Sequence, residues 1–128
     1  MDLFKDHTWG YIAIDGDNIG RQLEHLIATA TEDEVRSYAD KVSERLRNLI
    51  AIVINKGGRI VFSTGDGLLA WVTTNTIQEL IDKAIAEGND VTFSMGSGSG
   101  MIQSMLALKM AKATGRNRYL DWEDLVKK

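Results

Sequence analysis

Three aspartates follow or interrupt apolar segments, and together they have the chemistry of a site for a hard metal ion. Asp15 and Asp17 end the apolar run at residues 9–14, and Asp66 lies between two glycines in the segment 57–72, GGRIVFSTGDGLLAWV. Carboxylates and a backbone carbonyl are usual ligands of Mg²⁺, which takes further ligands from water and substrate phosphates. Each aspartate also has a structural alternative, because Asp17 can cap a helix and Asp66 can form a hairpin turn.

The three carboxylates taken together favour the metal interpretation over the structural one. A carboxylate at the end of an apolar strand has no packing value, and two like charges placed near each other are costly unless a cation joins them. This argument requires Asp15 and Asp66 to meet at one end of a sheet.

A basic pair near the C-terminus has the chemistry of a phosphate site. Lys112 and Arg116 are four residues apart in AKATGRNR, and they project the same way if the helix continues to Arg116. Lysine acts on phosphate as a point charge and arginine as a two-pronged donor. The structural alternative is that these cations complement the dipole at a helix C-terminus.

Alternating strand and helix patterns must position these residues. Asp17 or Asn18 is placed to cap a first helix, TEDE at residues 31–34 is a capping box that opens a long second helix, and Gly57 and Gly58 end that helix. Two strands joined by a tight turn follow as a β-hairpin, and later helices alternate with short strands. The expected strands cover residues 9–15, 59–62, 68–72, 91–95 and 118–122; the later helices cover residues 75–87, closed by Gly88-Asn89, and 101–114.

This order predicts an α+β fold with an antiparallel-containing sheet and helices packed on one face, as in ferredoxin-like folds. In such a sheet the first strand lies beside the central hairpin, so Asp15 and Asp66 are expected at the same end. The length of 128 residues fits one domain over residues 1–128. No repeat or linker divides the chain.

Composition narrows the classes of partner. The net charge of −3 gives no overall basic surface for duplex nucleic acid, and the absence of cysteine excludes disulfides and thiolate metal sites. No signal peptide and no apolar run long enough for a membrane span are evident. These features predict a cytoplasmic protein without a membrane partner. His7 and His25 are interpreted as ordinary surface or packing residues.

The motifs resemble those of a known superfamily. LKMAKATGRNR at residues 108–118 resembles the closing motif of GGDEF diguanylate cyclases, and IAIDGDN at residues 12–18 resembles the metal-binding first strand of the same palm superfamily. The short length, with DGDNIG and TGDGLLAW, is still more similar to the minimal CRISPR polymerases (mCpol), which are relatives of the palm domain in the large subunit of type III CRISPR complexes.

The resemblance implies a GGDEF-like palm fold and a nucleotidyltransferase for antiviral defence. Such an enzyme joins ribonucleoside triphosphates, generally ATP, into cyclic di- or oligonucleotides with two Mg²⁺ or Mn²⁺ ions, and a downstream effector binds the product. Two facing copies would close a ring, so a homodimer is expected. By this resemblance, Asp15 and Asp66 are expected to be catalytic. The expected metal ligands are Asp15, Asp17, Asp66 and the Gly16 carbonyl. The expected nucleotide-binding residues are Asn18, Lys112 and Arg116.

One position departs from the family pattern. The CRISPR palm usually carries Gly-Gly-Asp-Asp at the hairpin, whereas this chain has Thr64-Gly65-Asp66-Gly67. One carboxylate is missing, which leaves open a catalytically silent nucleotide-binding sensor of the same fold. A metal-free interaction domain is a third alternative, but it leaves the coincidence of the acidic and basic motifs unexplained.

Overall fold

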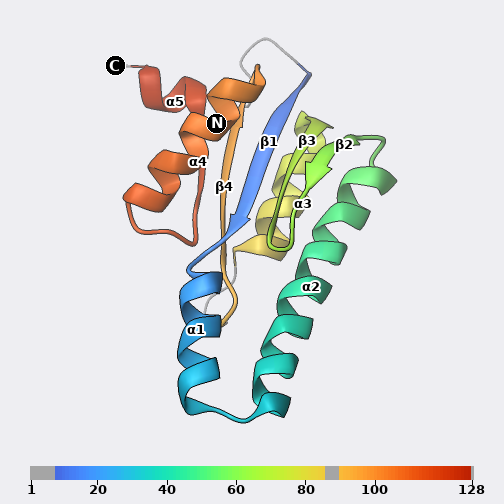
Figure 1. Cartoon of the computed structure of the whole chain (residues 1–128). Helices are drawn as coiled ribbons and strands as arrows, with labels where there is room; N and C mark the ends of the chain where they lie inside the picture. The colour runs from blue at the N-terminus through green and yellow to red at the C-terminus, as the bar shows by residue number, and fades with distance from the viewer. Residues whose placement is uncertain (1–7, 86–89, 128) are drawn as a thin grey trace.

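The computed structural model describes residues 8–85 and 90–127. Their elements occur in the order expected from the sequence, with one further short helix at the end (Figure 1). The elements are β1 (Trp9–Gly16), α1 (Ile19–Thr29), α2 (Glu32–Asn55), β2 (Arg59–Ser63), β3 (Gly67–Thr73), α3 (Thr74–Ala84), β4 (Phe93–Gly98), α4 (Met101–Ala113), β5 (Tyr119–Asp121) and α5 (Trp122–Val126).

The strands form one five-stranded sheet in the order β2-β3-β1-β4-β5. Strand β1 is central and pairs antiparallel with both β3 and β4, while β4 and β5 are parallel. Asp15 lies opposite Gly67 on one side and opposite Ser94 on the other. The α+β prediction and the placement of the first strand beside the hairpin are confirmed.

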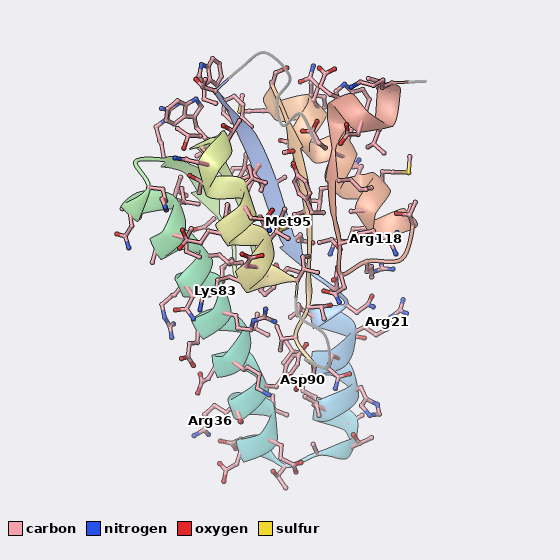
Figure 2. The ribbon with its side chains drawn as sticks, turned by 180° about the vertical axis from the view of Figure 1, so that it is seen from behind. Arg21, Arg36, Lys83, Asp90, Met95 and Arg118 are labelled. Atoms are coloured by element: carbon pink, nitrogen blue, oxygen red, sulfur yellow. The ribbon has the colours of Figure 1, made fainter. Side chains whose placement is uncertain are left out.

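Helices cover both faces of the sheet, so the expectation that they share one face is wrong. Ile12 and Ile14 of β1 pack in the main core with residues of α1, α2 and α3, whereas Ala13 packs in a second cluster with Leu108 of α4. Figure 1 shows α4 on one side of β1 and β4 and the helices α2 and α3 on the other. Figure 2 views the molecule from behind, with Met95 of β4 beside α3.

Close backbone contact holds α4 on the sheet. A Cβ built on Gly96 of β4 would lie 2.1 Å from the Leu108 nitrogen and 2.5 Å from the Ser104 carbonyl oxygen. Only glycine fits at this spacing, because any side chain would push α4 away. The close contact seats the middle of α4 on the sheet, and the helix then carries Lys112, in its last turn, to the end of β1.

Local signals placed most element boundaries correctly. Thr31 and Glu34 form the expected reciprocal capping box at the start of α2. Helix α3 ends at Ala84, and the expected closing residues Gly88 and Asn89, like His7, lie outside the described residues. The fourth strand begins at Phe93 rather than residue 91, and α5 was not expected.

Over the described ranges, no helix is both long enough and apolar enough to cross a membrane.

Candidate functional site

The hairpin tip and the end of β1 bring Asp15 and Asp66 to the same end of the sheet. The Gly16 amide donates a hydrogen bond to the Asp66 carbonyl (2.8 Å), and the Thr64 amide closes the tip on the Gly67 carbonyl (2.8 Å). The backbone of Asp66 therefore belongs to the turn, and its partly buried carboxylate is not part of the backbone bonds that close it.

The buried side chain of Asp17 binds residues from three other parts of the chain: the start of β4, helix α4 and the turn after α4. Its carboxylate, 4% exposed, accepts hydrogen bonds from Thr92 Oγ1 (2.8 Å), Ser94 Oγ (2.7 Å), Lys112 Nζ (3.1 Å) and the Asn117 amide (2.9 Å). Burial alone raises the pKa of a carboxyl, but these donors outweigh it, so the pKa of Asp17 is lowered. The expected helix cap is not formed by Asp17.

Four oxygen atoms surround the ammonium group of Lys112. Its Nζ lies 2.6 Å from the Gly16 carbonyl, 3.3 Å from the Asp15 carbonyl and 3.1 Å from both Asp15 Oδ2 and Asp17 Oδ1. Its side chain is 20% exposed. The lysine therefore contacts three of the four residues expected to bind metal.

Asp15 has the opposite electrostatic balance from Asp17. Burial raises its pKa, the Lys112 charge lowers it, and the negative charges of Asp66 and Asp17 raise it again, with a net increase. A carboxylate in such surroundings is stabilised by a further cation.

The turn after α4 corrects the expectation for Arg116. The helix ends at Ala113, and Gly115, Arg116 and Asn117 all have positive φ (136°, 62° and 49°). Arg116 is exposed, and its described hydrogen bonds are made by its backbone: the amide donates to the Ala111 carbonyl (2.9 Å), and the carbonyl accepts from Arg118 Nε (3.2 Å). Its side chain is thus placed by a left-handed turn, not by helical spacing from Lys112.

The same turn contains a residue that sequence reasoning missed. The Asn117 amide donates to Asp17 Oδ2 and Ser94 Oγ (3.1 Å), while its side-chain Oδ1 is buried without a partner among the described residues. Thr92 and Ser94, which also hold Asp17, were likewise not expected. The sequence contained an indication of their role: two hydroxyl residues stand two positions apart in an apolar strand, and this spacing places both side chains on the same face of the strand.

Asn18 stands at the entrance to α1 in a left-handed conformation (φ 56°). Its side chain makes no capping bond, although its carbonyl accepts from the Gln22 amide (2.9 Å). The residue is exposed beside Asp17.

Two cavities include residues of the hairpin tip. One of about 380 Å³ lies between the sheet and α4, with Asp15, Thr64 and Lys112 among its lining. The other, of about 300 Å³, lies against α1 and α2, with Asp66 and Ser43 as its polar side chains. Asp15 and Asp66 thus share one end of the sheet but line different cavities.

The residues present fit a divalent cation in part. Asp15 and Asp66 supply the carboxylate oxygens that such an ion prefers, at one end of the sheet, but they line different cavities. Asp17 and the Gly16 carbonyl are engaged by Lys112. In the part of the chain that the structure describes, no three Asp, Glu, His or Cys side chains gather as a metal site.

Solved structures share this fold. The Csm1-Csm4 cassette in complex with cA4 matches 87% of this chain with 18% identity and a TM-score of 0.67, and the match covers 20% of that longer chain. The GGDEF domain of DgcB from Caulobacter crescentus in complex with c-di-GMP matches 90% of this chain and 78% of its own (15% identity, TM-score 0.63). The match to the active GGEEF domain of a diguanylate cyclase from Vibrio cholerae covers 89% of this chain and 82% of that domain's chain, with 19% identity and a TM-score of 0.59.

At these identities the likeness shows the fold alone, which is that of a nucleotide cyclase or polymerase palm. No curated protein matches the chain. The family model described as the minimal CRISPR polymerase domain, mCpol, matches residues 11–121. That match takes in most of β1, Asp15 and Asp17 at its end, the hairpin, α4 and the turn after it, and the chain therefore belongs to the mCpol family.

Proposed function

We propose that this protein is a metal-dependent nucleotidyltransferase that makes cyclic di- or oligonucleotides from ribonucleoside triphosphates, with ATP as the first candidate, in antiviral defence. The observation that carries the proposal is the placement of Asp15 and Asp66 at one end of the sheet, joined through the Gly16–Asp66 hydrogen bond and flanked by Lys112. Membership of the mCpol family supports the same chemistry.

Asp15 and Asp66 are the proposed catalytic residues, and they would hold Mg²⁺ or Mn²⁺. When bound, the ion would lower the pKa of a ribose hydroxyl and neutralise charge on the phosphates. The protein contributes position: the strand pairing of β1 with β3 fixes Asp15, and the closed turn fixes Asp66. Phosphoryl transfer depends mainly on such positioning and on charge neutralisation.

The proposed nucleotide-binding residues are Asn18, Lys112 and Arg116. The Arg116 side chain is exposed at the turn after α4, and Lys112 lines the 380 Å³ cavity beside Asp15. Both would bring positive charge to the triphosphate. Closing a dinucleotide ring takes two bonds, so the active form is proposed to be a homodimer whose product acts on a separate cyclic-nucleotide-binding effector.

Incubation with each ribonucleoside triphosphate and Mg²⁺ or Mn²⁺, followed by mass spectrometry of the products, tests the activity. Wild type is expected to yield a cyclic product from ATP, and Asp15→Asn and Asp66→Asn are expected to yield none. Asp40→Asn, which removes an exposed charge on α2, serves as the matched control and should retain product formation. Product from Asp66→Asn equal to wild type would exclude the proposed site.

A catalytically silent nucleotide sensor is the second candidate, and Gly67 is the residue that favours it. Such a protein would bind ATP without forming product. Calorimetry of ATP and AMP binding to wild type and Arg116→Ala tests the shared phosphate site. A charge-assisted phosphate contact contributes about 1.5–3 kcal/mol, so the variant should bind ATP roughly ten- to a hundred-fold more weakly, with little change for AMP. Equal losses for the two ligands would remove Arg116 from the triphosphate site.

A further inference from the structure

The hairpin contains a β-bulge that changes which way its edge strand faces. Arg59 of β2 lies opposite Trp71, and Phe62 lies opposite Leu69, so partners two residues apart on β3 are three residues apart on β2. The extra residue is Val61, where the register shifts. Regular alternation would place Arg59 and Phe62 on opposite faces of the sheet. The bulge brings both to the same face as Leu69, which packs toward α4.

This face carries a cluster of planar side chains beside α4. Trp71 of β3 lies next to Trp9 of β1, with ring centroids 6.0 Å apart, and Trp9 contacts Tyr11 edge to face. The guanidinium of Arg59 lies over the Trp71 ring, 5.0 Å from its centroid. Trp9 is 41% exposed, and Arg59 is exposed as well. In Figure 1, α4 stands next to β4, while β3 and β2 lie on the other side of β1.

Phe62 continues the planar surface toward the cavity between the sheet and α4. Its side chain is 49% exposed and lines that cavity of about 380 Å³, together with Met105 and Lys109 of α4. Because Phe62 and Arg59 lie opposite residues two apart on β3, they are about 7 Å apart along the strand. The face therefore presents two exposed planar groups in series, one of them in the lining of a cavity.

The charges on this face have the opposite balance from those of the whole chain. The described side chains that belong to the face or line the cavity include three cations, Arg59, Lys109 and Lys112. The carboxylate among them is that of Asp15, which already pairs with Lys112 (3.1 Å). Positive charge is thus in excess here, although the chain has a net charge of −3. The face is complementary to an anion that has flat, apolar parts.

Unpaired nucleotides have these two properties. Sheets that bind single-stranded RNA stack bases on exposed aromatic side chains, and arginine guanidinium planes serve in the same way. We propose that this face binds single-stranded nucleic acid, with one base stacked on Phe62, the next on Arg59 above Trp71, and a phosphate beside Lys109. A duplex hides the faces of its bases and cannot use such a surface. The inference goes beyond the proposed function and requires no turnover.

Fluorescence anisotropy of a labelled oligoadenylate of about eight nucleotides, with a 5′-hydroxyl and without added metal, tests the inference. Wild type should bind the strand. Phe62→Leu keeps an apolar side chain but removes the ring, and it should bind roughly 5- to 100-fold more weakly. Phe62→Tyr keeps the ring and should bind as wild type does, as should Ile27→Ala, which truncates an exposed apolar residue of α1. No binding by wild type, or equal affinities of wild type and Phe62→Leu, overturns the inference.

Arg59 separates stacking from charge. Arg59→Lys keeps the charge but loses the planar group, so it should weaken binding about fivefold or more. The matched control is Arg21→Lys on α1, which should leave the affinity unchanged. Lys109→Gln should reduce the dependence of log affinity on log salt concentration by about 0.7, the value for one phosphate contact on a single strand. Wild-type affinity in Arg59→Lys would overturn the stacked arrangement.

Two further measurements locate the strand on this face. The same oligoadenylate paired with its complement should bind at least about tenfold more weakly, because its bases are then stacked within the duplex. Arg116→Ala, in the proposed triphosphate site, should bind the single strand as wild type does. Duplex binding equal to that of the single strand overturns the inference. A loss in Arg116→Ala equal to that in Phe62→Leu would place the strand at the triphosphate site and would also overturn it.

A second copy of the chain is the other occupant that an aromatic face can take. Sedimentation velocity of wild type and Phe62→Leu distinguishes it. A wild-type dimer that dissociates in Phe62→Leu, without strand binding, would identify the face as an interface between copies and overturn the inference. Failure of the proposed function is separate. Strand binding without product from any triphosphate supports the inference and overturns the synthase, and product without strand binding does the reverse.

Discussion

At the scale of single residues, Asp17 is the acidic side chain whose role the structure changes most. The sequence offered it as a helix cap or a metal ligand, and the structure uses its carboxylate to join β1, β4, α4 and the turn that follows α4. Burial without these donors would be costly, because an unpaired buried charge is strongly unfavourable. Asp17 thus positions the site whether or not it ever touches an ion.

Asp17→Ala is expected to lower the free energy of unfolding by about 2–4 kcal/mol, because four hydrogen-bond donors lose a charged acceptor. Urea denaturation at neutral pH measures the loss. Asp40→Ala, an exposed aspartate on α2, is the control and should change stability by less than about 0.5 kcal/mol. Equal stabilities for the two variants would show that the Asp17 bonds contribute nothing.

The pH dependence of that loss has a definite sign. The pKa of Asp17 in the folded protein is below its ordinary value of 3.8, so its stabilisation is present above that value. It is lost as the pH falls through the lower folded pKa. The stability difference between wild type and Asp17→Ala should therefore be constant from neutral pH to about pH 4.5 and shrink at lower pH. A difference that grows on acidification would contradict the assigned bonds.

At the scale of elements, the hairpin explains why a missing carboxylate cannot simply be restored at Gly67. This glycine does not have a positive φ, so turn conformation is not the obstacle. The obstacle is the neighbouring strand: a Cβ would meet Asp15 Oδ1 at 2.7 Å and the Ile14 carbonyl oxygen at 2.8 Å. The spacing of β1 and β3 at this register requires a residue without a side chain.

Gly67→Asp is expected to lose about 1–3 kcal/mol of stability through overpacking and to gain no activity. Gly67→Ala should show most of the same loss, measured by thermal or urea unfolding. Gly65→Ala is the matched control two residues away, where an added Cβ meets nothing within 4 Å, and it should be near neutral. A Gly67→Asp variant that is fully stable and more active would identify the position as a vacant ligand site.

The contact between α4 and β4 requires glycine at position 96 more strictly than the hairpin requires it at position 67, because an added Cβ would lie closer to its neighbours. Gly96→Ala places a Cβ 2.1 Å from the Leu108 nitrogen, so α4 must move away from the sheet and carry Lys112 with it. The expected loss is about 3 kcal/mol or more, or failure to fold. Gly20→Ala inside α1 meets nothing within 4 Å and should stabilise the protein by up to about 1 kcal/mol. Gly96→Ala with wild-type stability would refute the close packing.

At the scale of the whole molecule, one chain carries one Asp15–Asp66 pair, whereas a cyclic dinucleotide contains two newly formed bonds. If two copies act together, the rate of product formation per chain should fall on dilution, since the dimer dissociates by mass action. Initial rates over roughly a hundredfold dilution range, compared with sedimentation velocity in the presence of ATP, measure this. A constant rate per chain, from a species that sediments as a monomer, would mean that a single copy suffices.

The features that the sequence determined by itself are those set by neighbours along the chain. The Thr31–Glu34 capping box, the helical period of α2 and the two arms of the hairpin depend on contacts within a few residues, so their patterns predict them directly. The family motifs are of the same kind, because they are runs of adjacent residues. The order of strands and helices followed from these signals.

Only the tertiary structure decided which residues meet. The apolar run Ile12-Ala13-Ile14 lacks alternation, as a strand buried on both faces does, but it does not specify that α4 covers one face of β1 and the other helices the opposite face. The partners of Asp17 lie 75, 77, 95 and 100 residues away, and no local pattern specifies such contacts. Lys112 reaches the end of β1 because α4 is seated on Gly96, and Arg116 departs from it because the helix ends at Ala113. The sequence thus determined which charged residues the site contains. The packing of α4 on the sheet decided that Lys112 lies among the oxygen atoms of Asp15, Gly16 and Asp17.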